Sequence, residues 1–229
     1  MKANSILILN CFLDDSLAHS FDRALSRPIK QLNLTSRTIR IPDQHTLPEI
    51  DHHSHLVISG SEASALDEHS WYGVLAVIIM EFINHKKSVL GICFGHQFLA
   101  RVLAGAQCLR RAENPEFGWV AIQHNENPLF KGISNLVSMV SHYDEVIDLP
   151  GDFKVFASSN TCQVQAMQHK TLPVYGIQFH PEYNLQESGE IFDAVDRYDK
   201  NFASYFLNDL QDYTLFKQNK NVMINFLGR

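Results

Sequence analysis

Short apolar runs alternate with longer amphipathic stretches through the first half of the chain. The longer stretches, residues 16–27 and 66–86, carry apolar residues with helical spacing and are predicted as helices. The apolar runs have the length of strands and are predicted as strands at 5–10, 35–41, 55–59 and 88–92. Because strand, helix and strand follow one another repeatedly, we predict a parallel sheet with helices on both faces.

The second half of the chain has shorter apolar runs, separated by turn signals such as Asn127-Pro128 and Pro150-Gly151. The predicted strands there are 119–123, 137–141, 154–157, 164–168 and 174–179. This pattern predicts an antiparallel excursion added to the parallel core. The amphipathic segment 185–210 is predicted as one long helix. The sequence has no internal repeat and no linker, so residues 1–229 are interpreted as a single α/β domain.

The composition is typical of a globular protein, with 45% hydrophobic and 19% charged residues. The 25 acidic and 19 basic residues give a net charge of −6, which offers no electrostatic reason to bind nucleic acid or an anionic membrane. The longest apolar run, 71–83, is shorter than the ~20 residues of a membrane span and is interpreted as a buried helix. None of the four cysteines forms a Cys-x-x-Cys pair, so we predict a reducing, cytoplasmic location.

Residues 89–97 join an apolar strand to a helical pattern through Gly-x-Cys-x-Gly. A nucleophile at such a strand-to-helix turn has a strained backbone, and small neighbours two residues away, here Gly91 and Gly95, avoid crowding it. The positive end of the helix dipole would favour the thiolate form of Cys93. The alternative is that Cys93 is a small buried hydrophobic residue and that the glycines only permit a tight turn.

Residues 175–183 form an apolar strand that ends in His180-Pro181-Glu182. The imidazole of His180 could take a proton from a sulfur nucleophile and return it, and Glu182 could hold the tautomer and orientation of the ring. A histidine at a strand end is more often structural than catalytic. The presence of two segments that each carry part of a nucleophilic site favours the catalytic interpretation.

At these residues the chain resembles the class I glutamine amidotransferases, and specifically the amidotransferase domain of the GMP synthetases and its stand-alone relatives. The resemblance extends over most of the chain and follows the order of the family in four blocks, 58–61, 91–97, 141–146 and 176–182. It implies a triad of Cys93, His180 and Glu182. It also implies a flavodoxin-like fold, which is a three-layer α/β sandwich with a mainly parallel central sheet.

The resemblance further implies an oxyanion hole and a set of substrate contacts. One oxyanion donor would be the backbone N–H of Phe94, and the other would come from the Gly60-Ser61 loop. Many members of the family have a second glycine at the position of Ser61, but the backbone N–H of a serine can still donate. The other family contacts to the substrate would be made by Gln97, Ser141, His142 and Tyr143.

The sequence leaves the substrate and the partner open. The chain also resembles stand-alone γ-glutamyl peptidases, which share the cysteine turn and the His-Pro-Glu-Tyr-Asn block, so the small-molecule substrate is either glutamine or a γ-glutamyl peptide. A non-catalytic regulatory or binding module is a third alternative. In the synthetases, ammonia passes to a second domain that nothing in this sequence resembles, so we expect any acceptor to be a synthase partner on another chain.

We expect neither a metal nor a cofactor. The run 51–55 carries three histidines, with His45 nearby, but adjacent residues on an extended segment point to opposite faces. The run is therefore interpreted as a solvated loop before the third strand. No Gly-x-x-x-x-Gly-Lys motif is present, so residues 59–61 are not interpreted as an ATP-binding loop.

Overall fold

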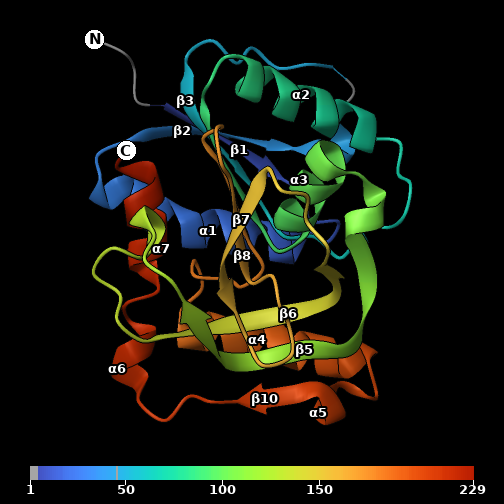
Figure 1. The fold of residues 1–229 in the computed structure, drawn as a ribbon, viewed down its shortest axis with the longest axis vertical. Coiled ribbons are helices and arrows are strands. Elements are labelled where there is room, and N and C mark those ends of the chain that lie inside the picture. Colours follow the sequence, from blue (N-terminus) through green and yellow to red (C-terminus); the bar gives the residue numbers. More distant parts are fainter. Residues whose placement is uncertain (1–4, 45) are drawn as a thin grey trace.

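A computed structural model describes residues 5–44 and 46–229. The described strands follow the order β10-β5-β7-β8-β9-β4-β3-β1-β2, with β6 added beside β5 (Figure 1). Five neighbouring strands are parallel, and they are β2 (Thr35–Arg40), β1 (Ser5–Asn10), β3 (His53–Ile58), β4 (Ser88–Ile92) and β9 (Val174–Ile177). The predicted parallel core is confirmed.

The other half of the sheet is mainly antiparallel. Its strands are β5 (Leu109–His124), β6 (Leu136–Val146), β7 (Phe153–Ser158) and β8 (Ala166–His169), and a short strand, β10 (Phe206–Asn208), pairs in parallel with β5. A bridge between Met139 of β6 and His180 brings this part beside the segment that follows β9. The antiparallel excursion therefore contributes to the same end of the molecule as the parallel strands.

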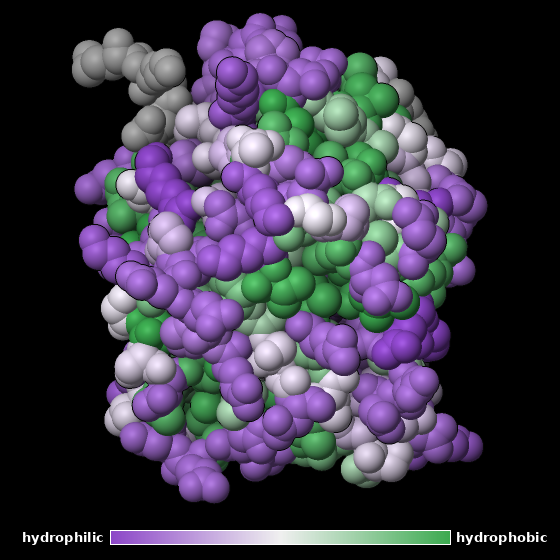
Figure 2. All heavy atoms as spheres, in the orientation of Figure 1, coloured by the Kyte–Doolittle hydropathy of each residue, from purple (hydrophilic) through white to green (hydrophobic). Residues whose placement is uncertain are grey.

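The helices range from one turn to almost five turns. Their bounds are α1 (Asp15–Gln31), α2 (Tyr72–Asn84), α3 (Phe94–Ala104), α4 (Leu185–Tyr198), α5 (Phe202–Tyr205), α6 (Tyr213–Phe216) and α7 (Lys220–Leu227), with 3-10 turns at Ile41–Asp43, Ala106–Cys108 and Pro128–Phe130. Within the described residues, no helix has the combined length and apolarity of a membrane-crossing segment. Hydrophilic residues cover much of the face in Figure 2, with hydrophobic residues between them.

Helices cover both faces of the parallel strands because side chains alternate between the two faces of a strand. Ile6 and Ile8 of β1 belong to the core that includes residues of α1 and α7. Leu7 and Leu9 belong to the opposite core, which includes residues of α2 and α3 (Figure 1). The predicted α/β sandwich, with helix layers on both sides of the sheet, is thus confirmed.

The prediction of one helix over 185–210 is wrong beyond α4. The residue after the helix, Asp199, has an extended backbone with φ −113° and ψ 106°, and its side chain accepts a hydrogen bond from the backbone of Asn201 at 2.9 Å. A short local turn therefore competes with continuation of the helix. Residues 206–208 then pair with β5, and the ring of Phe206 packs edge-on against Trp119. The apolar spacing reflects this packing and not a continuous helix.

Other predicted bounds also differ from the structure. The helix predicted from residue 66 begins at Tyr72, and the third strand begins at His53, earlier than the predicted 55. The strand predicted at 119–123 is the end of a 16-residue strand whose first half is largely polar. Polar residues fit there because the strand alternates exposed and buried positions at the edge of the antiparallel ribbon. The C-terminal helix α7 was not predicted.

Candidate active site

Cys93 lies at the turn between β4 and α3. Its backbone has φ 51° and ψ −107°, a strained conformation for a residue with a side chain. A Cβ atom on Gly91 would lie 2.3 Å from the carbonyl oxygen of Gly95, and a Cβ on Gly95 would lie 2.6 Å from the carbonyl oxygen of Ile58. The two glycines are therefore required by the close approach of β3, β4 and α3. The strain is concentrated at the cysteine, as the sequence predicts for a nucleophile turn.

His180 follows β9 and is fixed by a backbone hydrogen bond of 2.8 Å from its N–H to the carbonyl of Met139. Its Nδ1 lies 2.8 Å from Oε1 of Glu182, and both side chains are buried. Burial lowers the pKa of His180, but the charge of Glu182 and interactions with Cys93 and Glu182 raise it to about 10. The structure therefore brings Glu182 to the ring nitrogen that a positioning carboxylate would occupy.

Gly60, after β3, lies between the cysteine and the histidine. A Cβ atom on Gly60 would be 3.1 Å from Cε1 of His180 and 3.7 Å from Cβ of Cys93. The two side chains therefore converge on this glycine, although they are 87 positions apart in the sequence. The arrangement can support proton transfer between a thiol and an imidazole.

Cys93 and His180 line a pocket of about 210 Å³. This volume is below the ~300–1,000 Å³ of pockets for drug-sized ligands and suits a smaller molecule. Of the residues that the sequence singles out, those in its lining are Ser61, Cys93, Gln97, Ser141, His142, Tyr143 and His180. Glu182 lies behind His180, and the side chain of Phe94 packs in the core against Trp71 and Phe98, which leaves only its backbone available to the site.

Hydrogen bonds hold the loop that follows Gly60 in place. The hydroxyl of Ser61 donates to the carbonyl of Cys11 at 2.7 Å and accepts from the backbone of Ala63 at 3.0 Å. The carboxylate of Glu62 accepts from two backbone N–H groups of the loop before α1. The serine at the position of the family's second glycine thus has a local function, because its side chain fixes the loop.

Gln97 and His142 line the pocket, but their polar atoms also have partners within the protein. Nε2 of Gln97 donates to the carbonyl of Asp144 at 2.7 Å and to Gln178 at 3.1 Å. Nδ1 of His142 lies 3.1 Å from the same Asp144 carbonyl. This geometry supports a role in shaping the pocket wall, and direct contact of Gln97 or His142 with a substrate stays a prediction.

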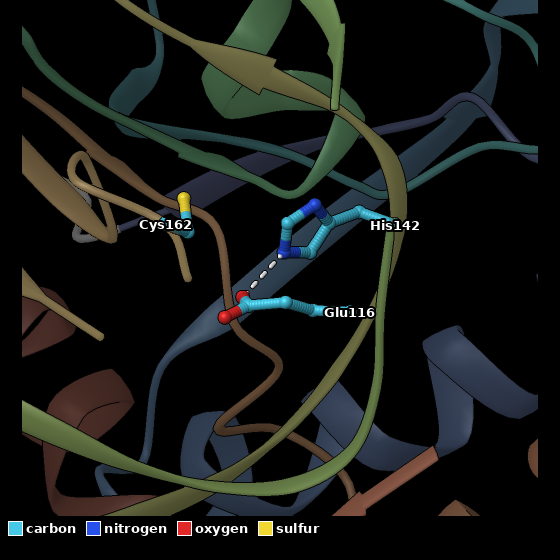
Figure 3. Close-up of side chains that lie close together, drawn as sticks. All are labelled: Glu116, His142 and Cys162. Atoms are coloured by element: carbon cyan, nitrogen blue, oxygen red, sulfur yellow. Dashed lines mark hydrogen bonds and ion pairs between the residues drawn. The ribbon is translucent and has the colours of Figure 1, made fainter. Parts of the chain in front are cut away.

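A buried carboxylate, Glu116, lies behind His142 and was missed in the sequence. One of its oxygens is 2.9 Å from Nε2 of His142, and the neighbouring Cys162 completes a group of three potential metal ligands, all within 4.8 Å of one another (Figure 3). The carboxylate also accepts hydrogen bonds from the side chains of Ser159, Thr161 and Gln165. Its acceptor capacity is therefore used by donors of the protein, and the group is a hydrogen-bonded network as it stands.

The histidines of the run 51–55 are arranged differently from the expected solvated loop. His53 and His55 belong to β3 and are buried, and Nδ1 of His53 lies 3.0 Å from the hydroxyl of Ser5. That expectation is wrong because the strand begins earlier and pairs with β1. His45 lies outside the described residues.

Arg111 and Asp144 also line the pocket and were not predicted. Their side chains form an ion pair of 3.0 Å, and the guanidinium of Arg111 lies 4.5 Å from the centre of the Tyr143 ring. Both belong to the β5–β6 ribbon. A signal was available for Asp144, which lies within the matched block 141–146, whereas nothing in the sequence distinguishes Arg111 from its neighbour Arg110.

Comparisons with known proteins agree with this geometry. A family model described as glutamine amidotransferase class-I matches residues 14–195. The glutamine-hydrolysing subunit of a GMP synthase from Methanococcus aeolicus is 43% identical over 109 residues, which span 47% of this chain and 57% of that relative. The corresponding GMP synthase subunit from Thermoplasma acidophilum is 37% identical over 166 residues, which span 71% of this chain and 79% of that relative.

The fold also matches a solved structure. The crystal structure of a glutamine amidotransferase from Thermotoga maritima has a TM-score of 0.79, with 17% identity and 100% of both chains covered. At this identity the likeness concerns the flavodoxin-like fold alone. The family model, in contrast, extends across the cysteine turn and the His-Pro-Glu segment. The chain therefore belongs to the class I glutamine amidotransferase family.

Proposed function

We propose that this chain hydrolyses the γ-amide of glutamine and releases ammonia through a γ-glutamyl thioester on Cys93. The observation that carries the proposal is the convergence of Cys93 and His180 on Gly60, with Glu182 hydrogen-bonded to the far side of the imidazole. Membership of the amidotransferase family supports the same reaction class. A binding module would have no physical need for this arrangement.

In the first half of the reaction, the thiolate of Cys93 attacks the γ-carbonyl carbon and forms the C–S bond. The negative charge on the carbonyl oxygen is stabilised by the backbone N–H of Phe94 and by the loop of Gly60 and Ser61. Phe94 is the first residue of α3, so its N–H has no acceptor within the helix. His180 gives a proton to the departing nitrogen as the C–N bond breaks, and ammonia leaves.

In the second half, His180 takes a proton from water, and the hydroxide attacks the thioester carbon. The C–S bond breaks, glutamate leaves and the sulfur returns to the thiolate, which is balanced by the proton on His180. Glu182 keeps Nδ1 of the ring protonated and oriented in both halves. Acid–base assistance of this kind contributes roughly 10²–10⁴ in rate, and one oxyanion donor contributes about 10²–10³.

The pocket supports a small γ-glutamyl substrate. Its volume of about 210 Å³ fits the size of a single amino acid better than that of a large conjugate. Within it, we assign Ser141 and Tyr143 to contacts with the α-amino and carboxylate groups, and Gln97 and His142 to the wall that shapes those contacts. The opposite charges of Arg111 and Asp144 at the pocket match the two charges of an amino acid.

The released ammonia would pass to a partner chain. The relatives from Methanococcus and Thermoplasma are named as subunits of a GMP synthase, which supports a synthase as the partner here. Such a partner would supply the acceptor for ammonia.

The test compares ammonia release from glutamine with glutamate release from γ-glutamyl dipeptides, for the wild type and for Cys93→Ala. We expect glutamine to be the better substrate and Cys93→Ala to lose turnover of both. A strong preference for dipeptides would replace this proposal with the peptidase alternative. Because such a chain can be silent without its partner, labelling of Cys93 by a glutamine-analogue electrophile is measured in parallel.

A further inference from the structure

We propose that Arg27, on α1, is a positioning residue that holds Glu182 in place for His180. The inference rests on the proposed function, in which Glu182 orients the His180 ring. Nη2 of Arg27 donates to the backbone carbonyl of Glu182 at 2.8 Å, across a sequence separation of 155 residues. A surface helix thus reaches the backbone of the residue assigned to hold the catalytic base.

Glu182 lies in a short segment between β9 and α4 that has few fixed points. At its beginning, the backbone N–H of His180 is bound to Met139. At its end, Asn184 caps α4, and the backbone N–H of Asn184 donates to the carboxylate of Glu187 at 3.0 Å. The bond from Arg27 holds the stretch between these two points.

The same guanidinium binds Glu187 with both of its Nη atoms, at 2.8 and 2.7 Å. A planar guanidinium matches a carboxylate in this two-bond geometry, whereas a lysine provides a single point of charge. The side chain of Glu187 is 7% exposed, so the pair is shielded on the Glu187 side. Arg27 therefore ties α1 to the cap of α4 and to the carbonyl of Glu182 at once.

The Glu182 carboxylate has little else to fix its orientation. Its Oε1 is bonded to His180, and its Oε2 has no hydrogen-bond partner among the described residues. A shift of the Glu182 backbone would therefore be transmitted to the bond with His180. Two surface clefts, of about 460 and 200 Å³, are each lined by both Arg27 and Glu182, so the guanidinium borders the solvent on this side of the segment.

The experiment measures the rate of Cys93 alkylation by iodoacetamide as a function of pH, with the modified peptide identified by mass spectrometry. This readout needs neither substrate nor partner, and it follows the stabilisation of the thiolate by protonated His180. The variants are Arg27→Ala, Arg27→Lys, Glu182→Gln and the double variant Arg27→Ala/Glu182→Gln. Arg23→Ala is the matched control, because Arg23 lies one helical turn earlier and approaches Glu187 at 3.6 Å without bonding to Glu182.

We expect Arg27→Ala to slow alkylation near pH 7 by about tenfold, within the ~10²-fold that a misplacement of about 1 Å can cost. Its pH profile should change in the same direction as that of Glu182→Gln. Arg27→Lys should be intermediate, and it also provides a folded variant if thermal unfolding shows that Arg27→Ala is not folded. The double variant should be no slower than Glu182→Gln alone, because both changes act through the same carboxylate.

Two results distinguish failure of the positioning role from failure of the proposed function. If Glu182→Gln changes the profile but the folded Arg27 variants match the wild type, or if the effects in the double variant add, the positioning role is overturned and the triad stands. If Glu182→Gln itself leaves the profile unchanged, the assigned role of Glu182 is overturned, and the role of Arg27 falls with it.

Discussion

Oε1 of Glu182 lies 2.8 Å from Nδ1 of His180, with both side chains buried. Although burial lowers the pKa of His180, the carboxylate and Cys93 raise it to about 10, from 6.5 for a free histidine. The folded state therefore holds this proton more tightly than the unfolded chain does. The pair stabilises the fold fully below pH 6.5, and this contribution is lost as the pH rises from there towards 10.

Replacement of Glu182 by glutamine tests this linkage. In Glu182→Gln the charge that stabilises the imidazolium is gone, so we expect the pKa of His180 to fall and the free energy of unfolding near pH 6 to drop by about 1.5–3 kcal/mol. The loss should be smaller at pH 10, where the wild type has also lost much of this contribution. NMR titration of the His180 ring and urea unfolding at the two pH values measure both effects.

The control for this variant is Glu190→Gln, which changes an exposed carboxylate in α4 whose recorded partner is Gln186. It should leave both the titration and the pH dependence of stability as in the wild type. An unchanged His180 titration in Glu182→Gln would contradict the assignment of the pair as the source of the raised pKa.

Selective labelling of Cys93 is the second prediction. The protein contains a matched comparison, because Cys162 also lies close to a histidine and a glutamate, namely His142 and Glu116. Burial, with the charge of Glu116, raises the pKa of the Cys162 thiol well above its usual range, so that thiol stays protonated. A glutamine-analogue electrophile should therefore modify Cys93 alone.

Intact-mass analysis and peptide mapping check this selectivity. One adduct is expected on the wild type and on Cys162→Ser, and none on Cys93→Ser. Equal labelling of Cys93→Ser, or an adduct mapped to Cys162, would show that proximity to a histidine and a carboxylate is not what activates the thiol.

The sequence predicted the parts of the site that are locally encoded. The strands Ser5–Asn10 and Ser88–Ile92 agree with their predicted bounds, because continuous apolar runs end there at polar or glycine-rich turns. The strained turn at Cys93 was readable because the two flanking glycines are needed by close backbone contacts. These features depend on residues a few positions apart.

The sequence did not predict the parts that depend on distant pairing. Arg27 has the pattern of a surface residue on an amphipathic helix, and its partner is 155 positions away. Glu116 lies in a polar stretch that reads as solvent-exposed, and it is buried because the loop after β7 folds over it with three donors. The end of α4 was missed because Asp199 and the pairing of β10 override the helical spacing.

Gly60 provides a third prediction, on activity. The Cβ of Gly60→Ala would lie 3.1 Å from Cε1 of His180 and 3.2 Å from Cζ of Phe12, so the histidine or the oxyanion loop must move by a few tenths of an ångström. We expect kcat to fall by about 10–100-fold, less than the cost of removing an oxyanion donor outright, with KM affected less. Steady-state kinetics on glutamine measure this split.

The control is Gly73→Ala, because a Cβ on Gly73 meets nothing within 4 Å and Gly73 lies inside α2. This substitution should leave kcat unchanged and raise the free energy of unfolding by about 0.5–1 kcal/mol, since alanine is the better helix former. Wild-type kinetics in Gly60→Ala would mean that the loop around Gly60 takes no part in the reaction.

The buried pair of Glu116 and His142 provides the last prediction, on stability. Burial raises the pKa of the Glu116 carboxyl, but His142, Ser159 and Thr161 together lower it below its usual value. Its contribution to stability is therefore present above pH 4.5, the usual pKa of a glutamate, and is lost as the pH falls through the lower value of the folded state. Glu116→Gln leaves His142 buried without its charged partner and should cost about 3–5 kcal/mol at pH 7. Urea unfolding between pH 3 and 7 should show that the variant loses part of the acid dependence of the wild type, while Glu113→Gln, an exposed position on the same strand, retains it. If Glu116→Gln unfolds with the wild-type midpoint and acid dependence, then the pair is not an ionic interaction that holds the wall of the pocket.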